Sequence, residues 1–171
     1  MNKIYEDITI VTVLYNSKKS AQSFFSNLEN FSIIVVDNGR NEKVLEKIKG
    51  YKNIKIISKN KNIGYGNAIN FAVKNVSTRF FLILNPDLKI DEKSIVNMYE
   101  VLNQYSDCAI VAPVTRFSKD FYGAFPERNI KNLSLKNALK SRDLLLNSEI
   151  ESEICVDVAK WALLIKAEEF K

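Results

Sequence analysis

The chain has 171 residues, with 25 lysines and arginines, 20 acidic residues, two cysteines and no histidine. This length suits a single domain spanning 1–171, in which folding buries roughly two thirds of the surface that the unfolded chain exposes. The lack of histidine excludes Ser-His-Asp triads, imidazole bases and histidine-ligated zinc, so proton transfer and metal binding would rest mainly on carboxylates.

The formal charge of +5 does not indicate nucleic-acid binding, because the lysines are spread along the whole chain rather than clustered. Cys108 and Cys155 lie in apolar segments, which favours buried thiols in a reducing compartment over a disulfide scaffold. The N-terminus lacks the positive region of a signal peptide, and no apolar run approaches the ~20 residues of a membrane span. We therefore expect a cytoplasmic protein without a nucleic-acid partner.

Short runs of apolar, mostly β-branched residues recur along the chain and predict strands. Several of them are continuously apolar and alternate with helical segments, which is typical of a mainly parallel sheet covered by helices on both faces. The predicted strands are Ile8–Leu14, Ser32–Asp37, Ile54–Ser58, Phe80–Leu84 and 109–114.

The helices between these strands have start signals or apolar stripes. Asn16 and Ser17 are candidate caps of a helix that runs to about residue 30, and Asp91 is a candidate cap of a later one. The spacing within 66–76 and after Asp91 predicts two buried stripes. These stripes comprise Ile69, Ala72, Val73 and Val76 in the first helix, and Ile95, Met98, Leu102 and Tyr105 in the second.

Beyond residue 114 the pattern loosens. The aromatic, glycine and proline-rich stretch 117–126 predicts a loop that either lines a site or crosses the surface with its rings turned inward. The segment 133–146 predicts an amphipathic helix with Lys136, Lys140 and Arg142 on it. This helix either makes a peripheral contact with a membrane surface or packs on its own domain.

Polar residues follow the first four predicted strands. In open α/β sheets, ligands bind outside the carboxyl ends of the strands. Each of these motifs alone is explained by a cap, a turn or a loop, but together they place amide, carboxylate and backbone N–H groups along one edge, as a nucleoside diphosphate requires. The candidate nucleotide-binding residues are Tyr15, Asn16, Asp37, Asn38, Asn62, Gly64, Asn85 and Asp87.

The order and spacing of four motifs resemble the family 2 glycosyltransferases. The motifs are VTVLYNS at 11–17, IVVDNG at 34–39, NIGYGNAIN at 62–70 and LILNPD at 82–87. The Leu-Asn-Pro-Asp form particularly resembles the rhamnosyltransferase-like branch, which builds bacterial O-antigens and other surface glycans. The resemblance implies an α/β fold of GT-A type, a Rossmann-like three-layer sandwich with a mainly parallel central sheet.

The resemblance also implies roles for these residues. Tyr15 and Asn16 match the loop that meets the nucleotide base and ribose, and Asp37 matches the acid that hydrogen-bonds the base. Asn62 and Gly64 match a further wall of the nucleotide pocket.

The sequence 85–87 takes the place of the Asp-x-Asp motif, whose last acid, here Asp87, ligates Mg²⁺ or Mn²⁺ bridging the diphosphate. Such a cation stabilises the negative charge that builds on the leaving phosphates. Because Asn85 replaces the first acid, we expect a metal site that is weaker or depends more on the oxygens of the diphosphate itself. Without the resemblance, Asp87 is also explained as a cap or turn acid ahead of the helix after Asp91.

Two features of the C-terminal part depart from the family pattern. Trp161 stands where the family places a glycine beside the transferred sugar, and it is either a core residue or a flat face in the donor or acceptor pocket. The carboxylate base of an inverting transfer has no counterpart, because Glu168 and Glu169 align with ordinary helix-start residues. We expect a truncated part of a longer enzyme, a gene fragment, or a short protein that binds a donor without turning it over.

The function implied is inverting transfer of a sugar from a UDP- or dTDP-linked donor to a glycan or lipid-linked acceptor. The alternative is a non-catalytic module that binds nucleotide-sugar. A Rossmann dinucleotide binder is disfavoured, because its glycine fingerprint should follow the first strand, whereas Gly64 and Gly66 follow the third.

Overall fold

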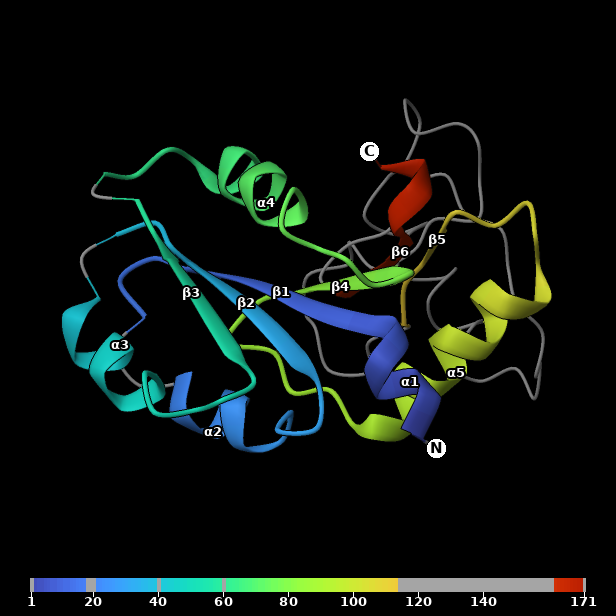
Figure 1. Cartoon of the computed structure of the whole chain (residues 1–171), viewed down its shortest axis with the longest axis horizontal. Helices are drawn as coiled ribbons and strands as arrows, with labels where there is room; N and C mark the ends of the chain where they lie inside the picture. Colours follow the sequence, from blue (N-terminus) through green and yellow to red (C-terminus); the bar gives the residue numbers. More distant parts are fainter. Residues whose placement is uncertain (1, 18–20, 40, 60, 114–161, 171) are drawn as a thin grey trace, which may run out of the picture.

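The computed structural model describes residues 2–17, 21–39, 41–59, 61–113 and 162–170 (Figure 1). The predictions for the loop 117–126, the helix 133–146, Cys155 and Trp161 lie outside the described residues. The elements are α1 (Asn2–Asp7), β1 (Ile8–Leu14), α2 (Ala21–Ser26), β2 (Ser32–Asp37), α3 (Glu42–Ile48), β3 (Ile54–Ser58), α4 (Tyr65–Val73), β4 (Phe80–Leu84), α5 (Glu92–Gln104), β5 (Ile110–Val111), β6 (Ala162–Lys166) and the 3₁₀ helix η2 (Ala167–Glu169).

The described strands form one sheet in the order β3-β2-β1-β4-β6-β5. β1 pairs in parallel with β2 and β4, and β2 pairs in parallel with β3. β6 is antiparallel to both of its neighbours, β4 and β5. The prediction of a mainly parallel sheet is therefore confirmed, with one antiparallel strand inserted near the far edge.

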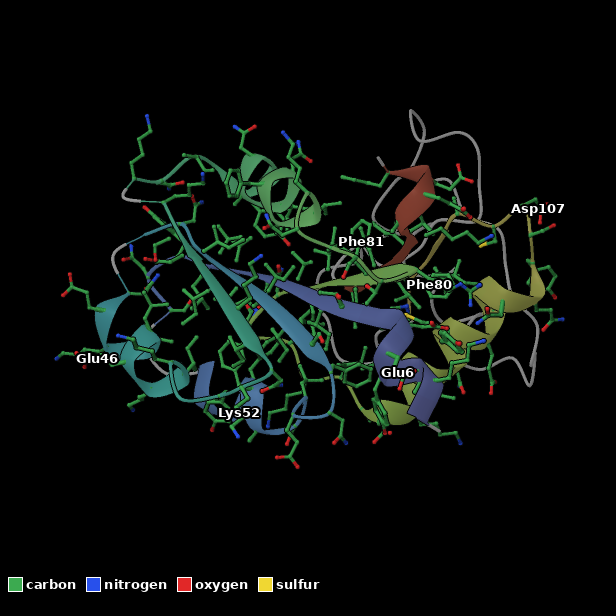
Figure 2. All side chains as sticks on the ribbon, in the orientation of Figure 1. Glu6, Glu46, Lys52, Phe80, Phe81 and Asp107 are labelled. Carbon is green, nitrogen blue, oxygen red and sulfur yellow. The ribbon has the colours of Figure 1, made fainter. Side chains whose placement is uncertain are left out.

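Helices cover both faces of the sheet, which makes three layers (Figure 1). Side chains of successive strand residues point to opposite faces, so Phe80 and Phe81 of β4 enter different cores (Figure 2). Phe80 packs in the core shared with α1, α2, α3 and α5, whereas Phe81 packs in the core beneath α4. Burial on both faces explains why β1, β2 and β4 are continuously apolar in sequence.

The first four strands have the predicted boundaries, because their apolar runs are bounded by polar and turn residues. The predicted strand 109–114 is shorter in the structure, where β5 comprises only Ile110–Val111. Among the described strands, this one pairs with β6 alone, through Ile110 opposite Ile165 and Val111 opposite Leu164. The apolar residues favour a longer strand, but the strand extends only as far as it is paired with a neighbouring strand.

The helix predictions are correct in part. Asp91 caps α5, since its Oδ1 accepts the backbone N–H of Ser94 at 2.7 Å. The stripe after Asp91 is buried except at Tyr105, which lies beyond the end of α5 and is exposed. Asn16 is wrong as the cap of α2, because the helix begins at Ala21 and Asn16 has φ 51, in the left-handed region.

The stripe predicted within 66–76 is buried as expected. Ile69, Ala72 and Val73 lie in α4, and Val76 is buried just beyond its end. None of the described helices is long and apolar enough to cross a membrane.

Candidate functional site

The carboxyl ends of β1 to β4 lie at one edge of the sheet, because these strands run parallel and in neighbouring positions. The backbone pairing continues past the strands: Asn38 N–H donates to Leu14 O at 2.9 Å, and Lys59 N–H donates to Asp37 O at 3.0 Å. We call this edge, formed by residues 15–17, 37–39, 41, 61–65 and 85–87, the carboxyl rim. All of the predicted nucleotide-binding residues lie on it.

Asn41 joins the end of β1 to the end of β2. Its Nδ2 donates to Asp37 Oδ1 at 3.0 Å and to Gly39 O at 3.1 Å. Its Oδ1 accepts the backbone N–H of Ser17 at 3.2 Å. Asp37 Oδ1 also accepts the backbone N–H of Gly39 at 3.3 Å, so the carboxylate is held in one orientation. Both Asp37 and Asn41 are buried, with 9% and 7% of their surface exposed.

Tyr15 presents an aromatic ring on the rim. Its ring lies against Gly39, since a Cβ added at that glycine would sit 2.8 Å from Tyr15 Cδ2. The ring remains 55% exposed, and Asn16 beside it is exposed as well. A planar base could therefore approach Tyr15 and Asn16 from solvent without displacing the core.

Asn38 joins the end of β2 to the loop before α4. Its Nδ2 donates to Asn62 Oδ1 at 2.9 Å, and its Oδ1 accepts the N–H of Ile63 at 2.8 Å. Asn62 Oδ1 also accepts the N–H of Gly64 at 2.8 Å. Asn38 is 3% exposed, so its side chain holds the loop and is hidden from a ligand. Asn62 and Gly64 are exposed.

Gly64 has a backbone conformation that only glycine adopts readily, with φ 83 and ψ 154. This conformation lets the chain turn from the loop into α4, whose first residue is Tyr65.

Tyr65 joins the start of α4 to the end of β4. Its hydroxyl donates to Asn85 Oδ1 at 2.8 Å. Burial raises the pKa of Tyr65, and the negative charge of the nearby Asp87 raises it further. Asp87 is exposed. Because Asp91 caps α5, Asp87 does not serve as its cap, and its carboxylate is left to face solvent beside Tyr65.

Sequence reasoning missed two residues of the rim, Asn41 and Tyr65. Asn41 looks like one more polar turn residue, and nothing in its neighbourhood shows that it is buried. Tyr65 lies inside a motif that was noted for its glycines, and its position at the first turn of a helix was the available signal. Together with Asn38, these two side chains link the ends of β1, β2 and β4 with the loop between β3 and α4 by hydrogen bonds.

No group of three or more histidine, cysteine, aspartate or glutamate side chains that could hold a metal ion occurs among the described residues. The exposed carboxylate of Asp87 still fits a cation that takes its other oxygen ligands from a bound diphosphate.

The open, mainly parallel α/β sheet with helices on both faces superposes on solved glycosyltransferases and has their GT-A, Rossmann-like fold. Residues 9–161 match the model of glycosyl transferase family 2, and the chain belongs to this family. The resemblance inferred from the four motifs is thus confirmed.

Three proteins illustrate the similarity. The teichoic acid poly(glycerol phosphate) polymerase of Staphylococcus epidermidis is 28% identical in an alignment of 128 residues that covers 69% of this chain and 17% of that protein. The mannosyltransferase PcManGT from Pyrobaculum calidifontis, in complex with GDP-Man and Mn²⁺, superposes with a TM-score of 0.64 and 14% identity, over 95% of this chain and 45% of that one. S. aureus TarS 1-349 in complex with UDP-GlcNAc superposes with a TM-score of 0.54 and 18% identity, over 68% of this chain and 38% of that one.

The chain therefore spans about a sixth of the polymerase and less than half of each solved chain.

Proposed function

We propose that the chain binds a nucleotide-sugar donor at the carboxyl rim and is the donor-binding part of a glycosyltransferase. The transfer proposed is of a sugar, with inversion, from a UDP- or dTDP-linked donor to a glycan or lipid-linked acceptor in bacterial surface polysaccharide synthesis. The observation that carries the proposal is the set of hydrogen bonds made by Asn41, Asn38 and Tyr65. They join the ends of β1, β2 and β4 with the loop between β3 and α4 into one rim that holds the family motifs.

The rim offers a distinct group for each part of a nucleoside diphosphate. The exposed ring of Tyr15 provides a surface for the base, and aromatic rings stack readily on planar groups. Asp37 is held rigidly beside it by Asn41 and Gly39, and a fixed carboxylate can accept an N–H of a base. Asn62 and Gly64 are exposed on the neighbouring loop and form the next wall.

Asp87 is the proposed metal-binding residue, with Mg²⁺ or Mn²⁺ as the cation. Its exposed carboxylate supplies one oxygen ligand, and the diphosphate supplies others. When bound, the cation would stabilise the negative charge on the leaving diphosphate. The GDP-Man and Mn²⁺ in the complex of the mannosyltransferase PcManGT support this choice of ligands.

Calorimetric titration tests the proposal. UDP, dTDP and GDP are titrated with and without Mn²⁺ into the native protein and into Asp87→Asn, which keeps the side-chain shape and removes the charge. We expect at least one nucleoside diphosphate to bind more tightly with Mn²⁺, and Asp87→Asn to lose most of this gain, about 10- to 100-fold. The proposal is wrong if no nucleoside diphosphate binds, or if binding is indifferent to both Mn²⁺ and Asp87.

Asp107→Asn is the matched control. Asp107 is also exposed, and it lies near Ala109, whose carbonyl accepts the N–H of Lys166. Lys166 pairs with Phe80 at the start of β4, so Asp107 lies at the opposite edge of the sheet from the rim (Figure 2). The control should bind like the native protein.

A separate assay distinguishes a transferase from a non-catalytic module. Release of nucleoside diphosphate from UDP- or dTDP-sugars is followed with a glycan or lipid-linked acceptor present. Turnover above the rate without protein supports the transferase, whereas tight binding without turnover supports the module.

A further inference from the structure

The side-chain amide of Asn85 has an oxygen that accepts hydrogen bonds and a nitrogen that donates them. Among the described residues, only the oxygen has a hydrogen-bond partner. Its Oδ1 accepts the Tyr65 hydroxyl at 2.8 Å. Its Nδ2 donates to no group among the residues that the structure describes. The planar amide therefore turns its oxygen toward the start of α4 and leaves its two N–H groups for another acceptor.

This orientation bears on what Asn85 can bind. An amide N–H₂ group repels a cation and attracts an anionic oxygen, whereas the amide oxygen, which could ligate a metal, already accepts one hydrogen bond from Tyr65. The neighbouring Asp87 carries the only formal charge in the segment 85–87. The segment therefore combines one group for a cation with one group for an anion, and a diphosphate with its metal ion presents both.

Tyr65 is well placed to fix this arrangement. It occupies the first position of α4, immediately after the glycine-only turn at Gly64, so its backbone is anchored by the helix and the loop. Its ring is 49% exposed, and its hydroxyl reaches across to the end of β4.

We infer that Tyr65 is a positioning residue that orients Asn85 so that its Nδ2 donates a hydrogen bond to an oxygen of the second phosphate of the bound nucleoside diphosphate. The inference rests on the proposed donor site and adds a specific partner for the diphosphate. Asn85 occupies the position of the first acid of the motif, and there it contributes to binding of the nucleoside diphosphate without a metal ion.

Five variants test this inference by titration with UDP and UMP, each with and without Mn²⁺. In Tyr65→Phe the ring stays and only the hydroxyl is lost, so metal-free UDP binding should weaken about 5- to 10-fold, as expected for one lost hydrogen bond. The affinity of Tyr65→Phe for UMP, which lacks the second phosphate, should change by less than about twofold. In Asn85→Asp a carboxylate faces the phosphate, so metal-free UDP binding should weaken by more than about 10-fold and Mn²⁺ should restore most of it.

A double variant separates positioning from a general structural effect. If Tyr65 acts through Asn85, Tyr65→Phe should change UDP affinity little once Asn85→Ala is present. Tyr51→Phe is the matched control, because Tyr51 is also exposed and lies before β3, at the amino edge of the sheet. It should bind UDP like the native protein.

The outcomes are distinct. If the native protein binds no nucleoside diphosphate, the proposed function fails and this inference fails with it. If the native protein binds UDP but Tyr65→Phe binds it equally well without metal, only the inference is overturned. Equal losses for UDP and UMP, or full additivity of the two substitutions, would also overturn it.

Discussion

Replacing Asn41 by alanine should weaken both the fold and the donor site, because one buried side chain joins two strand ends. The substitution removes three hydrogen bonds: those to Asp37 Oδ1, to Gly39 O and from the Ser17 N–H. Asn41 is 7% exposed, so water does not readily replace the lost partner.

The expected cost follows from the types of bond removed. A hydrogen bond to a charged group contributes about 1.5–3 kcal/mol, and a neutral one about 0.5–1.5 kcal/mol. Ser17 and Gly39 are partly exposed, so their backbone groups regain water and contribute at the low end. We therefore expect Asn41→Ala to lower the free energy of unfolding by about 2.5–4 kcal/mol. For a chain of this size that lowers Tm by about 5–16 °C.

Urea unfolding followed by circular dichroism measures the stability, and UDP titration measures the site. UDP affinity should fall in Asn41→Ala because Asp37 loses the bond that orients it. Asn97→Ala, an exposed position on α5, is the control and should change stability by less than about 0.5 kcal/mol. A loss below about 0.5 kcal/mol in Asn41→Ala, with unchanged UDP binding, would refute the reasoning.

Four further substitutions probe the rim and its supports by thermal unfolding and UDP titration. Gly64→Ala should destabilise the fold by about 1–3 kcal/mol, because φ 83 is strained for any other residue. Gly66→Ala, in open space within α4, is the control and should be neutral or stabilising by up to about 1 kcal/mol. Equal effects of the two substitutions would contradict this prediction. Gly39→Ala should weaken UDP binding more than stability, since its Cβ must displace the Tyr15 ring from 2.8 Å, and unchanged binding would show that the ring is not part of the site. Asp91→Ala should cost about 1 kcal/mol by removing the cap of α5, without changing UDP affinity. The pKa of Asp91 lies below its usual value, because its carboxylate accepts hydrogen bonds from the hydroxyl and the backbone N–H of Ser94. The cap therefore stabilises the fold above about pH 4 and is lost as the pH falls through the lowered pKa, which a pH series of unfolding curves should show for the native protein alone.

The motif residues had only a provisional meaning before their surroundings were known. The sequence also allowed Asp87 to be a helix cap, but in the structure Asp91 caps α5 by accepting the Ser94 N–H. Asn38 was grouped with the nucleotide-binding residues, yet both ends of its amide are used inside the protein. Its proposed role is therefore to hold the loop before α4, while Asn62 and Gly64 face outward.

The sequence by itself determined the elements and their order. The four runs from β1 to β4 have the observed limits, because polar turn residues end each run. In β1, β2 and β4, burial on both faces also demands mostly apolar residues. The cap at Asp91 and the apolar stripe after it were equally readable, since cap and helix periodicity are local properties. The parallel arrangement then brought the four motifs to one edge.

Only the tertiary structure decided which side chains connect that edge. Asn41 meets Ser17, Asn38 meets Asn62, and Tyr65 meets Asn85 across 24, 24 and 20 residues of chain. A polar residue in a loop has the same local pattern whether it faces solvent or joins two strand ends. Its burial and its partner depend on the spacing and twist of neighbouring strands, and these are set by packing of the whole sheet.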